Sequence, residues 1–488
     1  MNDLAEALYS TPEMSALFSG AGHVRRMLDF EAALARAEAQ AGVIPPEAAQ
    51  AISTACDVTQ FDVTILLRET ATAGTLAIPL AKALTARVGG EAGRYVHWGA
   101  TSQDVIDTAL MLQMRDGIDL LLRGLLALGA DCAMLAERHR DAPMAGRTLL
   151  QQALPITFGL RAARWLGLVT RQVARLRAVR AETLALQFGG AAGTLASLGT
   201  AGGGAERAGT VTERTESGAE WAGDATTAGG DGAAGSGSDI GGRVAELLGA
   251  ELALPVPSLP WHAERDRIAE VAAALGIVAG AMGKIAQDIL LLSQTELGEV
   301  AEGAAPGKGG SSTLPHKRNP VDTVAAIAAA RLAQAQVPVL LASMIQEHER
   351  AVGGWQAEWA ALPDLFCATG AAVERVRLAV AGLEVDAARM RANLGVTRGL
   401  LMAESLSMVL AAHVGKQEAH HVVQAACKRA VEQGSDLESV ARADPQISAA
   451  LSAERIAAAL DPAGYLGSTG LFIDRALADF SMLQGADA

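Results

Sequence analysis

The residues with the most evident potential for chemistry form one block, residues 309–320, which reads G-G-S-S-T-L-P-H-K-R-N-P. Asn319 followed by Pro320 is the pattern of a helix N-cap and a first helical residue. A helix should therefore begin there and direct its unpaired N–H groups and positive dipole end back at the loop. Because such an arrangement stabilises anions, we expect Lys317 and Asn319 to hold a carboxylate of a bound molecule.

The two adjacent serines of this block could transfer a proton. Neighbouring N–H groups and a cation lower the cost of forming a serine alkoxide, so Ser311 or Ser312 could act as an acid or a base. Gly307, Gly309 and Gly310 would let the loop close over a bound molecule, as mobile lids do. Taken alone, the block is equally compatible with a surface turn followed by an ordinary helix cap.

Residues 310–320 resemble the hallmark loop of the fumarase/aspartase superfamily, G-S-S-x-M-P-x-K-x-N-P, with Leu314 in the methionine position. The resemblance implies that the loop closes on the substrate and that its first serine, Ser311, is the proton-transfer residue. Ser312 remains the alternative assignment. Residues 303–309, G-A-A-P-G-K-G, lack the spacing and the preceding strand of a phosphate-binding loop, so no nucleotide is expected.

Residues 97–104, H-W-G-A-T-S-Q-D, resemble the first signature region of that superfamily. There, Thr and Ser hydroxyls bind a substrate carboxylate at a turn before a long helix, which implies this role for Thr101 and Ser102. As an isolated motif the segment is explained equally well by a helix N-cap at Ser102 or Asp104.

Residues 146–153, G-R-T-L-L-Q-Q-A, resemble the second signature region, which implies substrate binding by Thr148 and Gln151. Adenylosuccinate and argininosuccinate lyases carry a Thr-His pair there, and Leu149 stands in the place of that histidine. A nitrogen leaving group departs badly unless it is protonated. A carboxylate, whose acid has a pKa of about 4, departs as a stable anion. Leu149 therefore favours lactone opening or closure over amine release.

With Leu149 in the place of that histidine, the sequence most resembles the branch of the superfamily that isomerises 3-carboxy-cis,cis-muconate. Residues 260–266 and 348–359 also have the form of that branch. The implied reaction adds a carboxylate oxygen to a carbon of a tricarboxylate diene while charge spreads onto another carboxyl group as an enediolate. No metal or other cofactor is implied. The candidates for stabilising the enediolate are Lys317, Asn319, Thr148, Gln151, Thr101 and Ser102.

Further cationic side chains lie in motif-like contexts, and each is either a substrate contact or a surface or structural charge. These are His97, His262, Arg265, His316, Arg318, His348 and Arg350. Two alternative functions stay open: a C–N lyase such as adenylosuccinate lyase, and a structural protein without turnover, such as the lens crystallins of the superfamily. Leu149 argues against the first, and the complete loop with Ser311 argues against the second.

The elements that position these residues are predicted to be helices. Apolar residues recur at three- and four-residue steps over residues 27–41, and long helical runs are predicted at 104–138, 155–186, 265–297 and 320–347. Alternating strand patterns are nearly absent. We expect an all-α fold with a long central helix bundle (111–365) flanked by two smaller helical domains (1–110 and 366–488). Residues 200–241 contain 12 glycines in 42 positions, which predicts a disordered surface insert.

Composition narrows the class of protein. The chain of 488 residues has a formal net charge of −14, which disfavours nucleic acid as a partner. Its four cysteines form no C-x-x-C pair, its N-terminus is acidic where a secretory signal is basic, and its longest uncharged stretch, 183–205, is broken by glycines. We expect a cytoplasmic enzyme that acts on a small polycarboxylate, away from membranes. The resemblance implies a homotetramer whose subunits jointly bring the three signature regions together.

Overall fold

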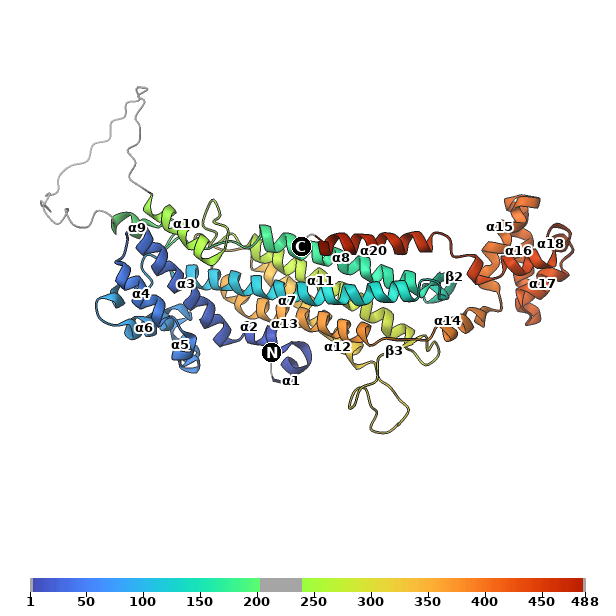
Figure 1. The fold of residues 1–488 in the computed structure, drawn as a ribbon, viewed down its shortest axis with the longest axis horizontal. Helices are drawn as coiled ribbons and strands as arrows, with labels where there is room; N and C mark the ends of the chain where they lie inside the picture. The colour runs from blue at the N-terminus through green and yellow to red at the C-terminus, as the bar shows by residue number, and fades with distance from the viewer. Residues whose placement is uncertain (1–2, 202–238, 486–488) are drawn as a thin grey trace, which may run out of the picture.

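The computed structural model describes residues 3–201 and 239–485. The insert predicted at 200–241 lies outside these residues except at its two edges. The described chain is mainly helical, as predicted, and forms a long rod (Figure 1). Long helices occupy the middle of the rod, and smaller groups of helices lie at its two ends.

Five long helices and the C-terminal helix form the central bundle. They are α7 (Ser102–Arg138), α8 (Phe158–Glu182), α11 (Asp266–Leu292), α12 (Val321–Ala342), α13 (Gly354–Ala381) and α20 (Thr469–Gly485), which packs along α8. α11 and α12 lie especially close because α11 presents glycines to α12. A Cβ atom added at Gly276 would lie 2.8 Å from Val337 Cγ2, and one at Gly280 would lie 2.8 Å from the Gln334 amide. The long helices predicted from periodicity correspond to α7, α8, α11 and α12, which confirms them.

The N-terminal end of the rod is a layer of shorter helices that packs on the start of α7 through α3. The helix predicted near residues 27–41 is part of α3. The group comprises α3 (Gly20–Gln40), α4 (Pro46–Ala55), α5 (Val63–Ala73), α6 (Ala77–Val88), α9 (Ala196–Ala201), α10 (Ile240–Leu252) and the 3₁₀ turns η1 (Val58–Gln60) and η2 (Ala92–Tyr95). The first two helices, α1 (Asp3–Tyr9) and α2 (Pro12–Leu17), lie instead along the bundle, where α1 packs on α13 and α2 on α7 and α13 (Figure 1).

The opposite end has its own apolar core, which runs through residues 394–460 and includes Leu406, Val423 and Ile447. Its elements are α14 (Ala387–Leu394), α15 (Ala403–Val414), α16 (Lys416–Gln433), α17 (Leu437–Ala443), α18 (Pro445–Ala450), α19 (Ala453–Ala459) and the 3₁₀ turns η3 (Gly395–Thr397), η4 (Leu400–Met402) and η5 (Pro462–Gly464).

Two short antiparallel pairs interrupt the helical pattern: β1 (Pro143–Thr148) with β2 (Gln151–Thr157), and β3 (Val300–Ala301) with β4 (Glu384–Val385). The prediction of a helical run from residue 155 was therefore wrong at its start, because Pro155 pairs with Ala145 in the hairpin. α8 begins only at Phe158, where the Thr157 hydroxyl accepts a hydrogen bond from Leu160 N (3.1 Å) and caps the helix.

The predicted domain bounds fall inside continuous helices. α7 runs through residue 110, α13 runs through residue 366, and α20 returns from the C-terminal end to the bundle (Figure 1). The division at 1–110, 111–365 and 366–488 stays a prediction.

α11 and α12 are each long and apolar enough to cross a membrane by length and composition. In the bundle they differ, because the most apolar window of α11 is 67% buried and that of α12 only 28%. α12 packs a stripe of alanines inward and leaves Val324, Leu332 and Leu341 exposed. One face of the bundle is therefore apolar and uncovered in the single chain.

Candidate active site

The first predicted site region lies at the start of α7 and is held by the buried carboxylate of Asp104. One of its oxygens is hydrogen bonded to Gly189 N (3.0 Å) and His262 Nε2 (2.8 Å), and the other accepts from Gly190 N (2.9 Å) and Thr101 N (3.0 Å). Asp104 thus joins three segments that are distant in sequence. The His262 side chain is itself buried, with 4% of its surface exposed.

Arg350 lies beside the same helix start. Its Nη1 donates to Thr101 Oγ1 (3.2 Å) and its Nη2 donates to Ala191 O (3.1 Å). The guanidinium therefore lies at the positive end of the dipole of a 37-residue helix, next to the hydroxyl of Thr101, and Ser102 is the first residue of that helix. A guanidinium at a helix N-terminus is a suitable partner for a carboxylate, and substrate binding by Thr101, Ser102 and Arg350 stays a prediction.

Arg265, predicted to bind substrate, lies in the interior and is 1% exposed. It donates to Asp107 (Nη1 to Oδ2, 2.7 Å) and to Glu358 (Nε to Oε1, 3.0 Å), and Trp355 Nε1 also donates to Asp107 Oδ1 (2.9 Å). Burial raises the pKa of the Glu358 carboxyl, and Arg265 opposes that effect. A direct contact between Arg265 and substrate is therefore corrected to a structural role, because its donors are committed to carboxylates of α7 and α13.

The third predicted region is the loop before α12. The Ser311 hydroxyl oxygen accepts hydrogen bonds from Thr313 N (3.2 Å) and Leu314 N (3.0 Å). Asn319 closes the base of the loop, since its N–H donates to Gly309 O (2.8 Å) and its amide Nδ2 to Gly310 O (3.5 Å). His316 and Lys317 are exposed on the same loop. The oxygen of Ser311, the serine predicted from the resemblance, therefore already accepts from two N–H donors.

The prediction that the start of α12 offers free N–H groups to an anion was wrong. α12 begins at Val321, one residue later than expected, and the residue before it, Pro320, has no side chain that could accept a capping hydrogen bond. Instead, the buried carboxylate of Glu302 accepts from Asp322 N (3.2 Å) and Thr323 N (2.7 Å). Lys308 lies 3.4 Å from the same carboxylate. A carboxylate of the protein itself therefore occupies this helix end.

The second predicted region is the tip of the β1–β2 hairpin. Thr148 pairs with Gln151 across a two-residue turn made of Leu149 and Leu150. Both leucines have positive φ, 51° and 63°, a conformation for which such turns normally use Asn or Gly. Their side chains are 97% and 73% exposed. Two apolar, strained residues thus project from the end of the hairpin, with Thr148 and Gln151 at their base.

The three regions do not share a cleft within one chain. α7 separates the first region from the hairpin, and its 37 residues correspond to a length of about 55 Å. Figure 1 shows the start of α7 near α3 and α9, the hairpin near the opposite end, and the loop after β3 on the side of the bundle. His97, Thr101, Ser102 and Arg350 lie together, whereas Thr148 with Gln151, and the loop with Ser311, His316, Lys317 and Asn319, lie elsewhere.

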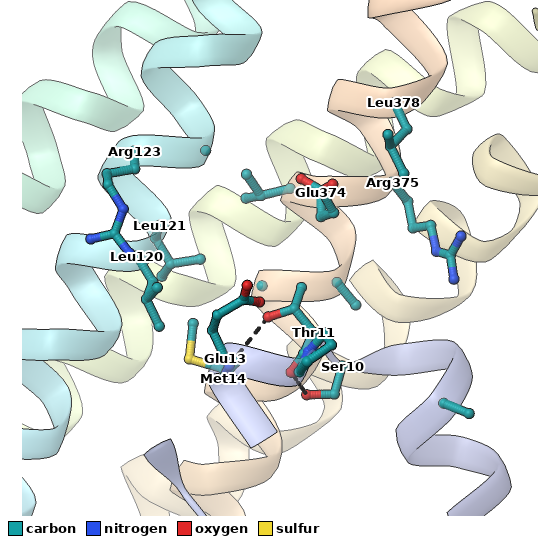
Figure 2. A pocket seen from close by; sticks show the side chains of 16 residues that line it. Ser10, Thr11, Glu13, Met14, Leu120, Leu121, Arg123, Glu374, Arg375 and Leu378 are labelled. Carbon is teal, nitrogen blue, oxygen red and sulfur yellow. Dashed lines mark hydrogen bonds between the residues drawn. The ribbon is translucent and has the colours of Figure 1, made fainter. Parts of the chain in front are cut away.

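One hollow on the bundle surface lies away from these regions. It has a volume of about 530 Å³ and lies between α2, α7 and α13, with Glu13, Arg123, Glu374 and Arg375 around it (Figure 2). None of the predicted site residues lines it. The motifs, and not this hollow, therefore mark the candidate site.

Two acidic residues that contact the motifs or the helix after them, Glu31 and Glu302, were not predicted from the sequence. Glu31 Oε1 lies 2.6 Å from His97 Nδ1. A signal for Glu31 was present, because it falls on the apolar stripe of the helix predicted at 27–41, where an unpaired acid would be costly. No comparable signal marked Glu302, which reaches α12 only through the fold.

Comparisons with known proteins identify the family of this chain. A family model described as lyase matches residues 7–213 and 222–337, and one described as adenylosuccinate lyase C-terminus matches residues 399–476. The chain is 46% identical to the 3-carboxy-cis,cis-muconate cycloisomerase of Pseudomonas aeruginosa, over 99% of this chain and 97% of the relative. It is also 46% identical to the protein of that name from Bradyrhizobium diazoefficiens, over 98% of each chain.

Among solved structures, the 3-carboxy-cis,cis-muconate lactonizing enzyme from Pseudomonas putida superposes with a TM-score of 0.87 at 44% identity, over 99% of this chain and 100% of that chain. The lyase family match covers more than half of the sequence. The chain therefore belongs to the fumarase/aspartase superfamily of lyases, as its loop at residues 310–320 predicted.

Proposed function

We propose that this chain is a 3-carboxy-cis,cis-muconate cycloisomerase, which interconverts that diene and 4-carboxymuconolactone in protocatechuate degradation. The observation that carries the proposal is the 46% identity to relatives of that name over nearly the full length of both chains. The loop of residues 310–320 is complete in this chain, with Ser311, Lys317 and Asn319 all present.

In the proposed reaction, a carboxylate oxygen forms a C–O bond to a carbon of the diene, and the electron pair moves onto a neighbouring carboxyl group as an enediolate. Ser311 then donates its proton to carbon, and in the reverse direction it removes that proton. The N–H groups of Thr313 and Leu314 support this role, because they would stabilise negative charge on Ser311 Oγ. Ser312 has no such pair of donors among the described residues and stays the alternative.

The substrate's carboxylates need cationic and hydrogen-bonding partners. Arg350, Thr101 and Ser102 supply one such group at the dipole end of α7. The other proposed contacts are His97, Thr148, Gln151, His316, Lys317 and Asn319. Leu149 supports a carboxylate as the leaving group in the reverse reaction, because the site then needs no acid at that position.

We also propose that the active enzyme is a homotetramer in which different subunits supply the three regions. The distance between the regions in one chain supports this assembly, since no single subunit can bring them to one substrate. The exposed Leu149 and Leu150 and the uncovered face of α12 support it as well, because apolar surface of this kind is typical of an interface. Such an interface would bury the apolar face of α12 against another subunit, so that this face need not contact a membrane.

A cytoplasmic location is part of the proposal. All four cysteines are unpaired in the structure, which is usual in a reducing compartment. The negative net charge supports the prediction that nucleic acid is not a partner.

The test is an ultraviolet assay that follows loss of the conjugated diene when the purified chain meets 3-carboxy-cis,cis-muconate. We expect rapid, enzyme-dependent loss of the diene. Adenylosuccinate is the control substrate, because residues 399–476 match a family model named for its lyase. We expect no fumarate from it. Release of fumarate, with no loss of the diene, would replace this proposal by the C–N lyase alternative.

A further inference from the structure

His97 is held by an acidic residue of a different helix. Its Nδ1 lies 2.6 Å from Oε1 of Glu31, which belongs to α3 and is 3% exposed. The backbone of His97 has a φ of 58°, in the left-handed region that non-glycine residues rarely adopt. The contact with Glu31 holds the ring at this strained backbone position, four residues before Thr101, the N-cap of α7.

The charges around His97 favour its protonated form. Burial alone would lower the pKa of the imidazole, but the charge of Glu31, the hydrogen bond to it and the charge of Asp104 together raise that pKa above its ordinary value. Asp104 is itself hydrogen bonded to His262. Among the described residues, none is hydrogen bonded to Nε2 of His97, so this nitrogen is left for a ligand.

A second buried acid, Glu38, lies on the same helix. Neither of its carboxyl oxygens has a hydrogen-bond partner among the described residues. Burial, reinforced by the charge of Glu31, raises the pKa of Glu38 to about 9, so Glu38 is neutral near pH 7. Burial likewise raises the pKa of the nearby Cys56 thiol to about 12. Of these α3 carboxyl groups, Glu31 is therefore the one that supplies charge to His97.

We propose that Glu31 is a positioning residue that fixes the His97 ring through Nδ1, so that Nε2 binds a carboxylate of the substrate as part of an imidazolium cation. The inference rests on the proposed function, because it takes a polycarboxylate as the ligand. Within the described part of the chain, the Glu31 side chain is hydrogen bonded only to the His97 ring, and it acts through that ring. His97 binds charge and transfers no proton to carbon, so its loss changes KM more than kcat.

The pH dependence follows from the sign of the charge. The imidazolium is present below the pKa of His97 and is lost as the pH rises through it. Because Glu31 raises this pKa, removing the charge of Glu31 lowers it, and the alkaline decline of kcat/KM then begins at a lower pH. An opposite charge at hydrogen-bond distance typically changes a pKa by about 1–3 units.

The experiment compares Glu31→Gln with Glu38→Gln in the diene assay across pH. Glu31→Gln keeps the size of the side chain and an oxygen that can accept from Nδ1, but it removes the charge. We expect KM to rise about tenfold, kcat to stay within about twofold, and the alkaline limb to move to lower pH by about one unit. Glu38→Gln replaces a neutral acid by a neutral amide and should reproduce the wild-type profile.

An unchanged KM and an unmoved alkaline limb in Glu31→Gln would overturn the inference. If that variant does not fold, His97→Asn decides, because Asn tolerates positive φ and its amide can still donate to Glu31. The alkaline limb should then disappear, and its persistence would also overturn the inference. Absence of diene turnover in the wild-type chain is a separate result, which would contradict the proposed function and not the pairing of Glu31 with His97.

Discussion

Replacing Ser311 by Ala is expected to lower kcat for loss of the diene by about 10³-fold. A positioned general acid or base typically contributes about 10²- to 10⁴-fold, and the two N–H donors at Ser311 Oγ would add their effect only while this oxygen carries charge. KM should change little, because the carboxylate partners stay in place. Steady-state kinetics of the purified variant in the ultraviolet assay measures both constants.

Ser312→Ala is the matched control for this prediction. Ser312 is the adjacent, exposed residue of the same loop, and we expect its loss to change kcat by no more than a few-fold. If Ser312→Ala abolishes turnover while Ser311→Ala retains it, the proton-transfer role belongs to Ser312. The N–H contacts at Ser311 would then be those of an ordinary turn.

Replacing Arg265 by Met is expected to reduce the free energy of unfolding by about 3–5 kcal/mol. The guanidinium is buried between Asp107 and Glu358, so its removal leaves two carboxyl groups in the interior with no cation beside them. The loss arises from those uncompensated groups more than from the ion pairs themselves. Urea unfolding of the assembled protein, followed by circular dichroism, provides the measurement.

The control for this second prediction is Arg377→Met. Arg377 forms a two-bonded ion pair with Glu374 on α13, with distances of 2.8 and 2.7 Å, but both side chains are about one third exposed. Partly exposed pairs of this kind contribute less than about 1 kcal/mol. Equal destabilisation by the two substitutions would contradict this prediction. It would show that the burial of Arg265 between Asp107 and Glu358 does not increase the cost of losing the cation.

The helices were predictable because their apolar spacing is a local property. The stripe near Met27 and the long apolar runs that became α7, α11 and α12 could all be recognised from the sequence. The β1–β2 hairpin was not, because its turn is Leu149-Leu150 in place of the Asn-Gly or Asp-Gly that signals such a turn. The strained leucines make local propensity a poor guide at this candidate site region.

Contacts between distant residues could not be predicted in the same way. Nothing near Asn319 indicates that Glu302 folds onto the first turn of α12 and occupies the expected anion site. Similarly, the motif around Arg265 does not show that Asp107 and Glu358 enclose it. Ser311, Thr101 and Arg350 were identified as candidates because they lie in motifs, whereas Glu31, the proposed positioning residue, lies on another helix. The positions of charged partners are set by tertiary packing and not by sequence neighbours.

The central claim is that one site draws Ser311 from one subunit and Arg350 from another, and mixing two inactive variants tests it most directly. Ser311→Ala lacks the proton donor, and Arg350→Met lacks the guanidinium beside Thr101. If the regions come from different subunits, mixed assemblies contain some sites that are wild type at both positions, up to about one quarter when subunits assort at random.

Co-expressing the two variants with different affinity tags and purifying by both tags isolates the mixed assemblies. We predict that their diene turnover rises far above that of either variant alone and approaches about one quarter of the wild-type rate. Mixed assemblies that form in good yield but are no more active than the parent variants would contradict the account.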